Sequence, residues 1–184
     1  MDGSLYRKLT MLALLGGATW GIVWSVLAPY LRGLGYSGAE YGAMGGTAVF
    51  TGAIFTLAGG ALSDKYGARR VVAVALLAQA AALELIATGS KPLVALGFLL
   101  QGAANGASFS SQQALVARSE RDEKLHYAFS YVAAARSLGG ALGSFLGFAP
   151  VLASRHLGVA LVEAYSATLH LAGLLPLAAS PIAL

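Results

Sequence analysis

Residues 60–70 read Gly-Ala-Leu-Ser-Asp-Lys-Tyr-Gly-Ala-Arg-Arg, a short charged stretch between two long apolar runs, 41–62 and 71–87. Two glycines, Gly60 and Gly67, bracket an acidic residue, and basic residues close the stretch. A helix needs about 20 apolar residues to cross the hydrocarbon core of a bilayer. Each run is about that long, so we expect the charged stretch to be a tight loop at a membrane surface.

The composition predicts an integral membrane protein. Of the 184 residues, 57% are hydrophobic and 11% are charged, whereas a soluble domain is about a quarter charged. The absence of cysteine excludes disulfides, thiol chemistry and cysteine-ligated metals. The net charge of +4 is spread over short loops, so it does not indicate nucleic-acid binding. The sequence contains no paired acids, no histidine cluster and no phosphate-binding loop. It therefore predicts no cofactor, no metal site and no enzymatic reaction that depends on such groups.

We predict an all-α fold, a single six-helix transmembrane bundle over residues 1–184, arranged as three helices plus three. The expected spans are 10–31, 41–62, 71–88, 92–117, 127–153 and 157–179. Arg7 and Lys8 precede the first run, as in a secretory signal, but that run is too long for a signal core and five more follow it. The arrangement allows the second three helices to repeat the first three, although the two halves share little residue identity.

Basic residues fall mainly on one side of the predicted membrane. That side receives Arg7, Lys8, Lys65, Arg69, Arg70, Arg118, Arg121 and Lys124, and the other receives Arg32, Lys91 and Arg155. Cytoplasmic loops carry an excess of lysine and arginine. We therefore expect a multi-pass protein of the plasma membrane with both termini in the cytoplasm.

In this position, residues 60–70 resemble the signature loop of the major facilitator superfamily, Gly-x-Leu-(Ala/Ser)-Asp-(Lys/Arg)-x-Gly-(Lys/Arg)-(Lys/Arg). The matching residues are Gly60, Leu62, Ser63, Asp64, Lys65, Gly67 and Arg69. Ala68 departs from the pattern, and Arg70 supplies a charge one position later.

Weaker matches occur elsewhere. The glycine-rich segment 139–147 resembles the family's fifth helix, but Gly143-Ser144 replaces the Gly-Pro of proton antiporters, so antiport is not supported. Gln101-Gly102 resembles the end of the family's Arg-x-x-Gln-Gly pattern, with Phe98 at the arginine position. Residues 118–124 resemble the family's loop between helices four and five.

The resemblance implies transport of a small molecule or ion by alternating access, without covalent chemistry or a cofactor. Full members have about twelve helices in two halves that rock around a midplane site. This chain would supply the amino-terminal half, with a second six-helix half or a second copy as its partner. The alternative is a non-transporting six-helix membrane subunit or remnant that binds a partner half.

The resemblance also implies that residues 60–70 form a conformational latch. Asp64 would cap or pair near a helix end, and Lys65, Arg69 and Arg70 would hold the inward face closed. The alternative is that the basic residues only fix the orientation of the chain.

Span four places Gln101, Asn105, Ser108 and Gln112 on one helical face. The resemblance puts this helix at the central cavity, so Gln101 and Asn105 are candidate substrate contacts. Hydrogen bonding between helices is the alternative. In span one, Trp20 and Trp24 lie one turn apart, so Trp24 would either form an aromatic wall of the cavity or pack against small residues.

Three spans carry isolated charged or titratable residues. Arg136 lies about nine residues into span five, where an unpaired charge costs at least ~2.5 kcal/mol. It would bind an anionic substrate or couple transport, or else reach the interface or the acids Glu120, Asp122 and Glu123. Glu84 in span three would bind a proton or cation, or pair with a basic residue. Glu163, Ser166 and His170 share a face in span six, as a proton relay or as polar packing.

Two further patterns have competing interpretations. Gly45, Gly52 and Gly59 are spaced by sevens and predict a close helix-packing seam. The segment Gly106-Ala107-Ser108-Phe109, with the later His170, partly resembles the Gly-x-Ser-Gly and histidine of six-helix rhomboid proteases, but it lacks the final glycine.

Overall fold

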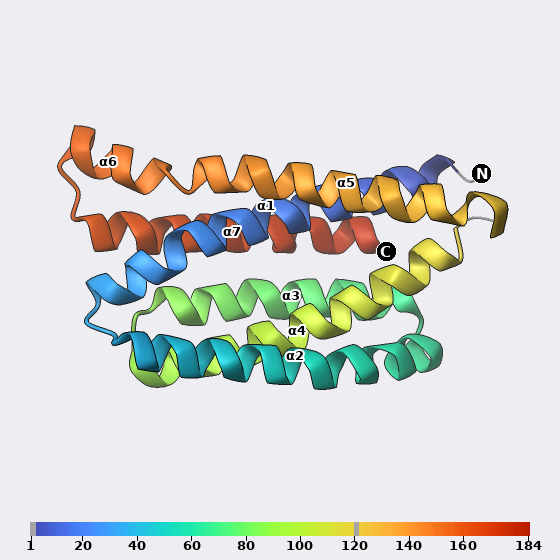
Figure 1. Cartoon of the computed structure of the whole chain (residues 1–184), viewed down its shortest axis with the longest axis horizontal. Coiled ribbons are helices and arrows are strands. Elements are labelled where there is room, and N and C mark those ends of the chain that lie inside the picture. The colour runs from blue at the N-terminus through green and yellow to red at the C-terminus, as the bar shows by residue number, and fades with distance from the viewer. Residues whose placement is uncertain (1–2, 120–121) are drawn as a thin grey trace.

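The computed structural model describes residues 3–119 and 122–184, with the side chains of 6–119 and 125–184, and the described part of the chain is helical (Figure 1). Its helices are α1 (Gly3–Gly33), α2 (Gly38–Tyr66), α3 (Ala68–Ala87), α4 (Lys91–Ala117), α5 (Asp122–Leu146), α6 (Ala149–Leu157) and α7 (Leu161–Ala183). Six segments are long and apolar enough to cross a membrane, with α5 and α6 forming one of them, Leu125–Leu157. The predicted all-α fold with six spans is confirmed.

The expected loop at residues 60–70 is wrong in its extent. Helix α2 continues to Tyr66, and Gly67 alone separates it from α3. The Gly67 amide still donates to the Ser63 carbonyl, and its φ of +89° lies in the region that glycine adopts most readily. A single glycine thus makes the whole turn.

Span five is also interrupted, where the sequence predicted one helix over 127–153. Helix α5 ends at Leu146 and α6 begins at Ala149. Pro150 lies in the first turn of α6, where the missing proline N–H would be unsatisfied in any case. Helix α6 then runs past the predicted end of span five to Leu157.

The helices form two groups, with α1, α5, α6 and α7 in one and α2, α3 and α4 in the other (Figure 1). The most extensive contacts join α2 to α4 and α1 to α5, followed by α3 with α4 and α7, and α1 with α7. The first helix of each predicted half therefore packs against the second helix of the other half. This reciprocal exchange is the arrangement expected of two related three-helix units.

Glycines make the two closest helix contacts possible. A Cβ atom added at Gly17 of α1 would overlap the Arg136 carbonyl oxygen of α5, and one at Gly102 of α4 would overlap the Ala48 carbonyl oxygen of α2. Both glycines open a Gly-x-x-x-Gly pattern, whose lack of side chains lets helix backbones approach closely. The first helix of each predicted half thus carries the same glycine pattern, although the two halves share little residue identity.

The predicted seam on α2 holds for two of its three glycines. A Cβ atom at Gly52 would lie 3.3 Å from the Gly102 carbonyl oxygen, and one at Gly59 would lie 2.8 Å from the Ala107 Cα. The prediction is wrong for Gly45, which has nothing within 4 Å of such an atom. Gly45 instead lines a cavity.

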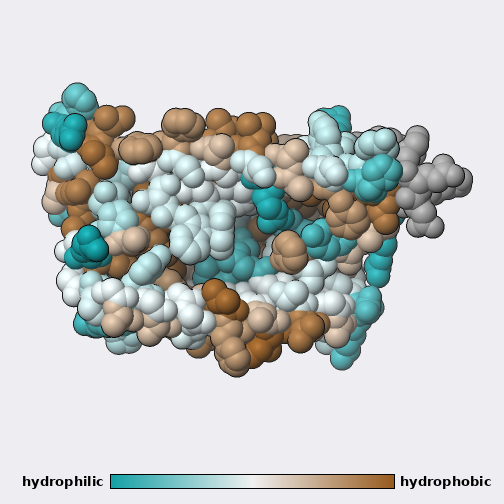
Figure 2. Space-filling model, viewed as in Figure 1, coloured by the Kyte–Doolittle hydropathy of each residue, from teal (hydrophilic) through white to brown (hydrophobic). Residues whose placement is uncertain are grey.

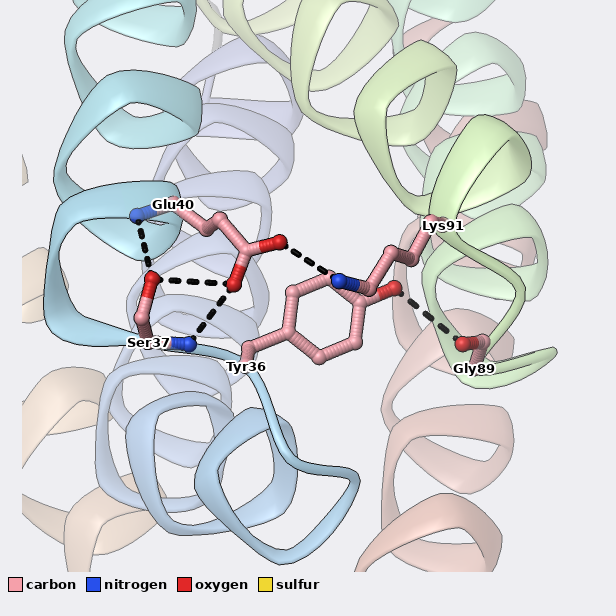
Figure 3. Close-up of polar contacts among 5 residues, drawn as sticks. All are labelled: Tyr36, Ser37, Glu40, Gly89 and Lys91. Carbon is pink, nitrogen blue, oxygen red and sulfur yellow. Dashed lines mark hydrogen bonds and ion pairs between the residues drawn. The ribbon is translucent and has the colours of Figure 1, made fainter.

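The start of α1, the end of α7, the α2–α3 turn, the end of α4 and the start of α5 lie toward one end of the molecule, which we call the termini end (Figure 1). A polar cluster at the opposite end joins the α1–α2 and α3–α4 connections (Figure 3). Ser37 and Glu40 form a capping box at the start of α2, and Glu40 Oε1 lies 2.6 Å from Lys91 Nζ. The Tyr36 hydroxyl donates to the Gly89 carbonyl at 3.1 Å, and burial raises the pKa of Tyr36, which keeps the hydroxyl protonated.

Candidate functional site

A cavity of about 610 Å³ opens between the two helix groups. Figure 2 shows it as a central hollow with hydrophilic residues at its base. Helices α1, α2, α4 and α5 supply most of the walls, and α3 supplies part of the base. The polar lining residues are Thr56, Gln79, Gln101, Asn105, Ser108, Gln112, Arg136 and Ser137. A volume in this range suits a small organic solute.

The polar face predicted on span four lines this cavity and connects α4 to the helices on either side. The Gln79 side-chain amide of α3 donates to Asn105 Oδ1 at 2.8 Å. Gln112 donates to Ser108 Oγ at 2.8 Å, and Gln112 Oε1 accepts from Arg136 Nη2 at 2.7 Å. Part of the α4 face therefore forms helix-to-helix hydrogen bonds, the alternative that the sequence left open.

Gln101 differs from the other polar residues of α4. Its Oε1 atom is buried and has no hydrogen-bond partner among the described residues. A buried acceptor without a partner costs about 1–3 kcal/mol. Because Gln101 lines the cavity, a bound solute or water that donates a hydrogen bond there would remove this penalty.

Arg136 extends from α5 to the cavity and is half-buried. It is the one charged residue in the described cavity lining, and the described acidic side chains form no ion pair with it. The side chains of Glu120, Asp122 and Glu123, its predicted alternative partners, lie outside the described residues. The Gln112 amide, a neutral group, holds the guanidinium.

Trp20 and Trp24 form an aromatic wall on α1. Their ring centroids are 5.3 Å apart with an interplanar angle of 65°, which is an edge-to-face arrangement. Both side chains line the cavity and are about half exposed. Trp24 therefore lies where the sequence placed a candidate contact.

Glu84 does not line the cavity. Its Oε2 atom lies 2.6 Å from His170 Nδ1, and the pair joins α3 to α7 with both side chains about half exposed. Ser166 donates to the Ala87 carbonyl at 3.0 Å. Of the three span-six residues, His170 alone contacts an acidic side chain within the part of the chain that the structure describes. These residues bring α3 and α7 together, away from the cavity.

The arrangement does not assemble a serine–histidine catalytic pair. Ser108 lines the cavity and bonds to Gln112, whereas His170 bonds to Glu84. Groups of three or more histidine, cysteine, aspartate or glutamate side chains suited to a metal ion are absent from the described side chains, those of residues 6–119 and 125–184.

The signature stretch lies at the termini end. Gly60, Leu62, Asp64 and Lys65 belong to the last turns of α2, and Arg69 and Arg70 belong to the first turn of α3. Asp64 Oδ1 pairs with Arg118 Nη2 of the α4 end at 3.3 Å, and both side chains are exposed. Behind it, the buried Ser63 hydroxyl donates to Ser111 Oγ at 2.7 Å.

Sequence reasoning missed several of these contacts. Gln79 could have been found, because an amide inside an apolar span indicates an interior position. Arg118, the partner of Asp64, and Ser111, the partner of Ser63, lie 54 and 48 residues away along the chain. No local pattern connects residues so far apart.

A comparison with models of known protein families identifies the family of this chain. The family model described as the Major Facilitator Superfamily matches residues 9–183, which is almost the whole chain. Among curated proteins, no match is found.

Proposed function

The chain belongs to the Major Facilitator Superfamily, and from this premise we propose that it carries a small solute across the membrane by alternating access. The observation that supports this proposal is the cavity between the helix groups, with amides on one wall and an aromatic pair on another. Sites of this kind fix a solute with a few polar groups and surround the rest of it with apolar surface.

The solute would bind without covalent chemistry. Gln101 offers an acceptor that has no partner among the described residues. Asn105 accepts from Gln79 through its Oδ1 atom, and its own amide hydrogens can be donated to a solute. Trp24 offers an apolar face at the same cavity. We therefore propose Gln101, Asn105 and Trp24 as solute contacts, and we assign Glu84 to helix packing.

Alternating access needs a second body that moves against this one. In the apolar part of α2, 6% of the residues are buried, and in that of the α5–α6 segment 22% are buried. The corresponding share in the other spans is 39–50%. Large apolar side chains remain exposed on these two helices: Val49, Phe50, Leu57, Leu138, Leu142 and Phe145. A second six-helix bundle, from the same protein, a partner or a second copy, would cover α2 and α5 and close the cavity.

Residues 60–70 would serve as the latch of this movement, with the termini end in the cytoplasm and the protein in the plasma membrane. The Asp64–Arg118 pair is solvent-exposed, so it contributes about 0–1 kcal/mol. A contact of this size is readily exchanged between conformations. Lys65, Arg69 and Arg70 are exposed beside it and available to a second body.

Single cysteines test the proposal because these 184 residues contain no other cysteine. Ser137→Cys puts a thiol in the cavity, and Leu77→Cys puts one on an exposed apolar face of α3 outside it. A membrane-impermeant methanethiosulfonate is applied to cells and to inverted vesicles. Alternating access predicts labelling of Ser137→Cys from both faces and of Leu77→Cys from neither.

Labelling of Ser137→Cys from one face only would refute alternating access and support the non-transporting subunit. Uptake of a solute panel into proteoliposomes, with and without a pH gradient, then identifies the solute and the coupling. The panel uses the complete protein together with any partner bundle that co-purifies with it.

A further inference from the structure

We propose that the cavity selects an anionic solute and that Arg136 is its charge anchor. This inference rests on the proposed function, since it names the chemical class of solute that the same cavity takes. It goes beyond family membership, which fixes no charge for the solute.

The charge of the cavity lining is the first support. Arg136 is its one charged residue among the described positions, and arginine stays protonated in proteins. A cleft with low-dielectric walls and charge of one sign concentrates counter-ions. The lining therefore attracts anions and repels cations.

The guanidinium is held in place, and among the described residues it uses one donor. One nitrogen, Nη2, donates to Gln112 Oε1 at 2.7 Å, and Gln112 is fixed in turn by its bond to Ser108. A guanidinium has five N–H donors in a planar fork that matches carboxylate or phosphate oxygens. Within the described part of the chain, the remaining donors have no carboxylate partner. The guanidinium is thus positioned to bind an anion by two parallel hydrogen bonds.

The position of Arg136 along the bundle brings it near the aromatic wall. The α1–α5 seam fixes its height, because Gly17 of α1 packs against the Arg136 carbonyl. Trp20 is one helical turn beyond Gly17, about 4.5 Å along the axis at a rise of 1.5 Å per residue. Charge and apolar surface therefore meet at adjacent levels of one cavity, which favours an organic anion with an apolar body over an inorganic ion.

Tryptophan fluorescence tests the proposal directly, because Trp20 and Trp24 are the two tryptophans of the sequence and both line the cavity. The purified protein in detergent is titrated at constant ionic strength with iodide, caesium or acrylamide, which are anionic, cationic and neutral quenchers. The compared proteins are the wild type, Arg136→Gln, Arg136→Lys and Arg155→Gln. Arg155 is an exposed arginine of α6 outside the cavity, so its variant controls for the loss of one positive charge.

We expect Arg136→Gln to lower the iodide quenching constant by at least about twofold and to raise the caesium constant, because the local potential falls. Acrylamide quenching should stay unchanged, as a check on the fold and on access. Arg136→Lys, which keeps the charge, and Arg155→Gln should both resemble the wild type. An iodide constant that is equal in wild type and Arg136→Gln, with acrylamide quenching unchanged, would overturn the proposal. If acrylamide quenching shifts in Arg136→Gln, the comparison with Arg136→Lys decides, and equal iodide constants in wild type and Arg136→Lys support the charge assignment.

Competition experiments then distinguish an organic anion from an inorganic one. Benzoate should protect the tryptophans of the wild type from iodide, whereas benzyl alcohol and benzylammonium, of similar shape, should not. Inorganic phosphate protecting as well as benzoate would place the selectivity in charge alone and refute the organic anion. The assay requires no transport, so labelling of Ser137→Cys from one face would refute the carrier function and leave the anion site standing.

Discussion

Replacing Gly106 by alanine tests the α2–α4 seam on which the cavity depends. The added Cβ atom would overlap the Gly52 carbonyl oxygen and lie 2.8 Å from the Thr56 nitrogen. Both are backbone atoms of α2, so no side-chain rotation relieves the contact, and the two helices must separate. Forcing extra volume into a packed contact destabilises a protein by about 1–3 kcal/mol.

The same substitution also changes helix propensity, which needs a control. Alanine is favoured over glycine in a helix by about 0.5–1 kcal/mol. Gly46 of α2 has nothing within 4 Å of an added Cβ atom and does not line the cavity. Gly46→Ala therefore gains propensity without a clash, and the difference between the two variants isolates the seam.

Thermal unfolding in detergent, followed by circular dichroism, measures this difference. At about 2–4 °C per kcal/mol for a chain of this size, Gly106→Ala should melt several degrees below Gly46→Ala. A Gly106→Ala protein that melts with or above Gly46→Ala would show that the backbones of α2 and α4 do not approach closely at Gly106.

Three further tests address the two ends of the bundle and the contact between α3 and α7. Ser37→Ala removes the α2 cap and should lower the melting temperature by the equivalent of about 1 kcal/mol; Ser90→Ala, at a helix start with no side-chain cap bond, should not. A double-mutant cycle on Glu84 and His170, read by unfolding, should give a coupling of about 0.6 kcal/mol, and zero coupling would contradict the contact. Asp64→Asn should reduce uptake in proteoliposomes while membrane insertion stays normal, and unchanged uptake would remove the latch from the mechanism.

The fold could be predicted from sequence where the signal is local. Long apolar runs predict the spans, and the spacing of residues 60–70 indicates the family. The exact ends of the helices are harder to predict, because they depend on how neighbouring segments pack. Nothing in residues 60–66 distinguishes a loop from the end of α2, since Gly60 is tolerated inside a packed helix. Likewise, the apolar run continues through Leu146, so it does not indicate the break before α6. Pro150 is the residue in the sequence that indicates this break.

In the candidate site, too, local sequence patterns predict some features and tertiary packing determines the others. Helical periodicity alone places Gln101 and Asn105 on one face of α4, and the structure puts both residues at the cavity. Periodicity cannot say which member of that face is already satisfied. Asn105 is bonded to α3, whereas the Oε1 atom of Gln101 has no described partner, and this difference depends on Gln79, a residue 26 positions away from Asn105.

Arg136 and Glu84 illustrate why the direction of a charged side chain escapes a sequence. Each is an isolated charge in an apolar span, and each was open to pairing or to solute binding. The difference comes from the neighbours that packing supplies. Glu84 contacts His170 of α7 at 2.6 Å, so its carboxyl group has a partner outside the cavity. Arg136 meets the neutral amide of Gln112, which orients a positive charge without neutralising it. An oriented charge in a cavity, with no acidic partner among the described side chains, is the arrangement that an anionic solute completes, and comparing Arg136→Lys with Arg136→Gln separates that role from packing.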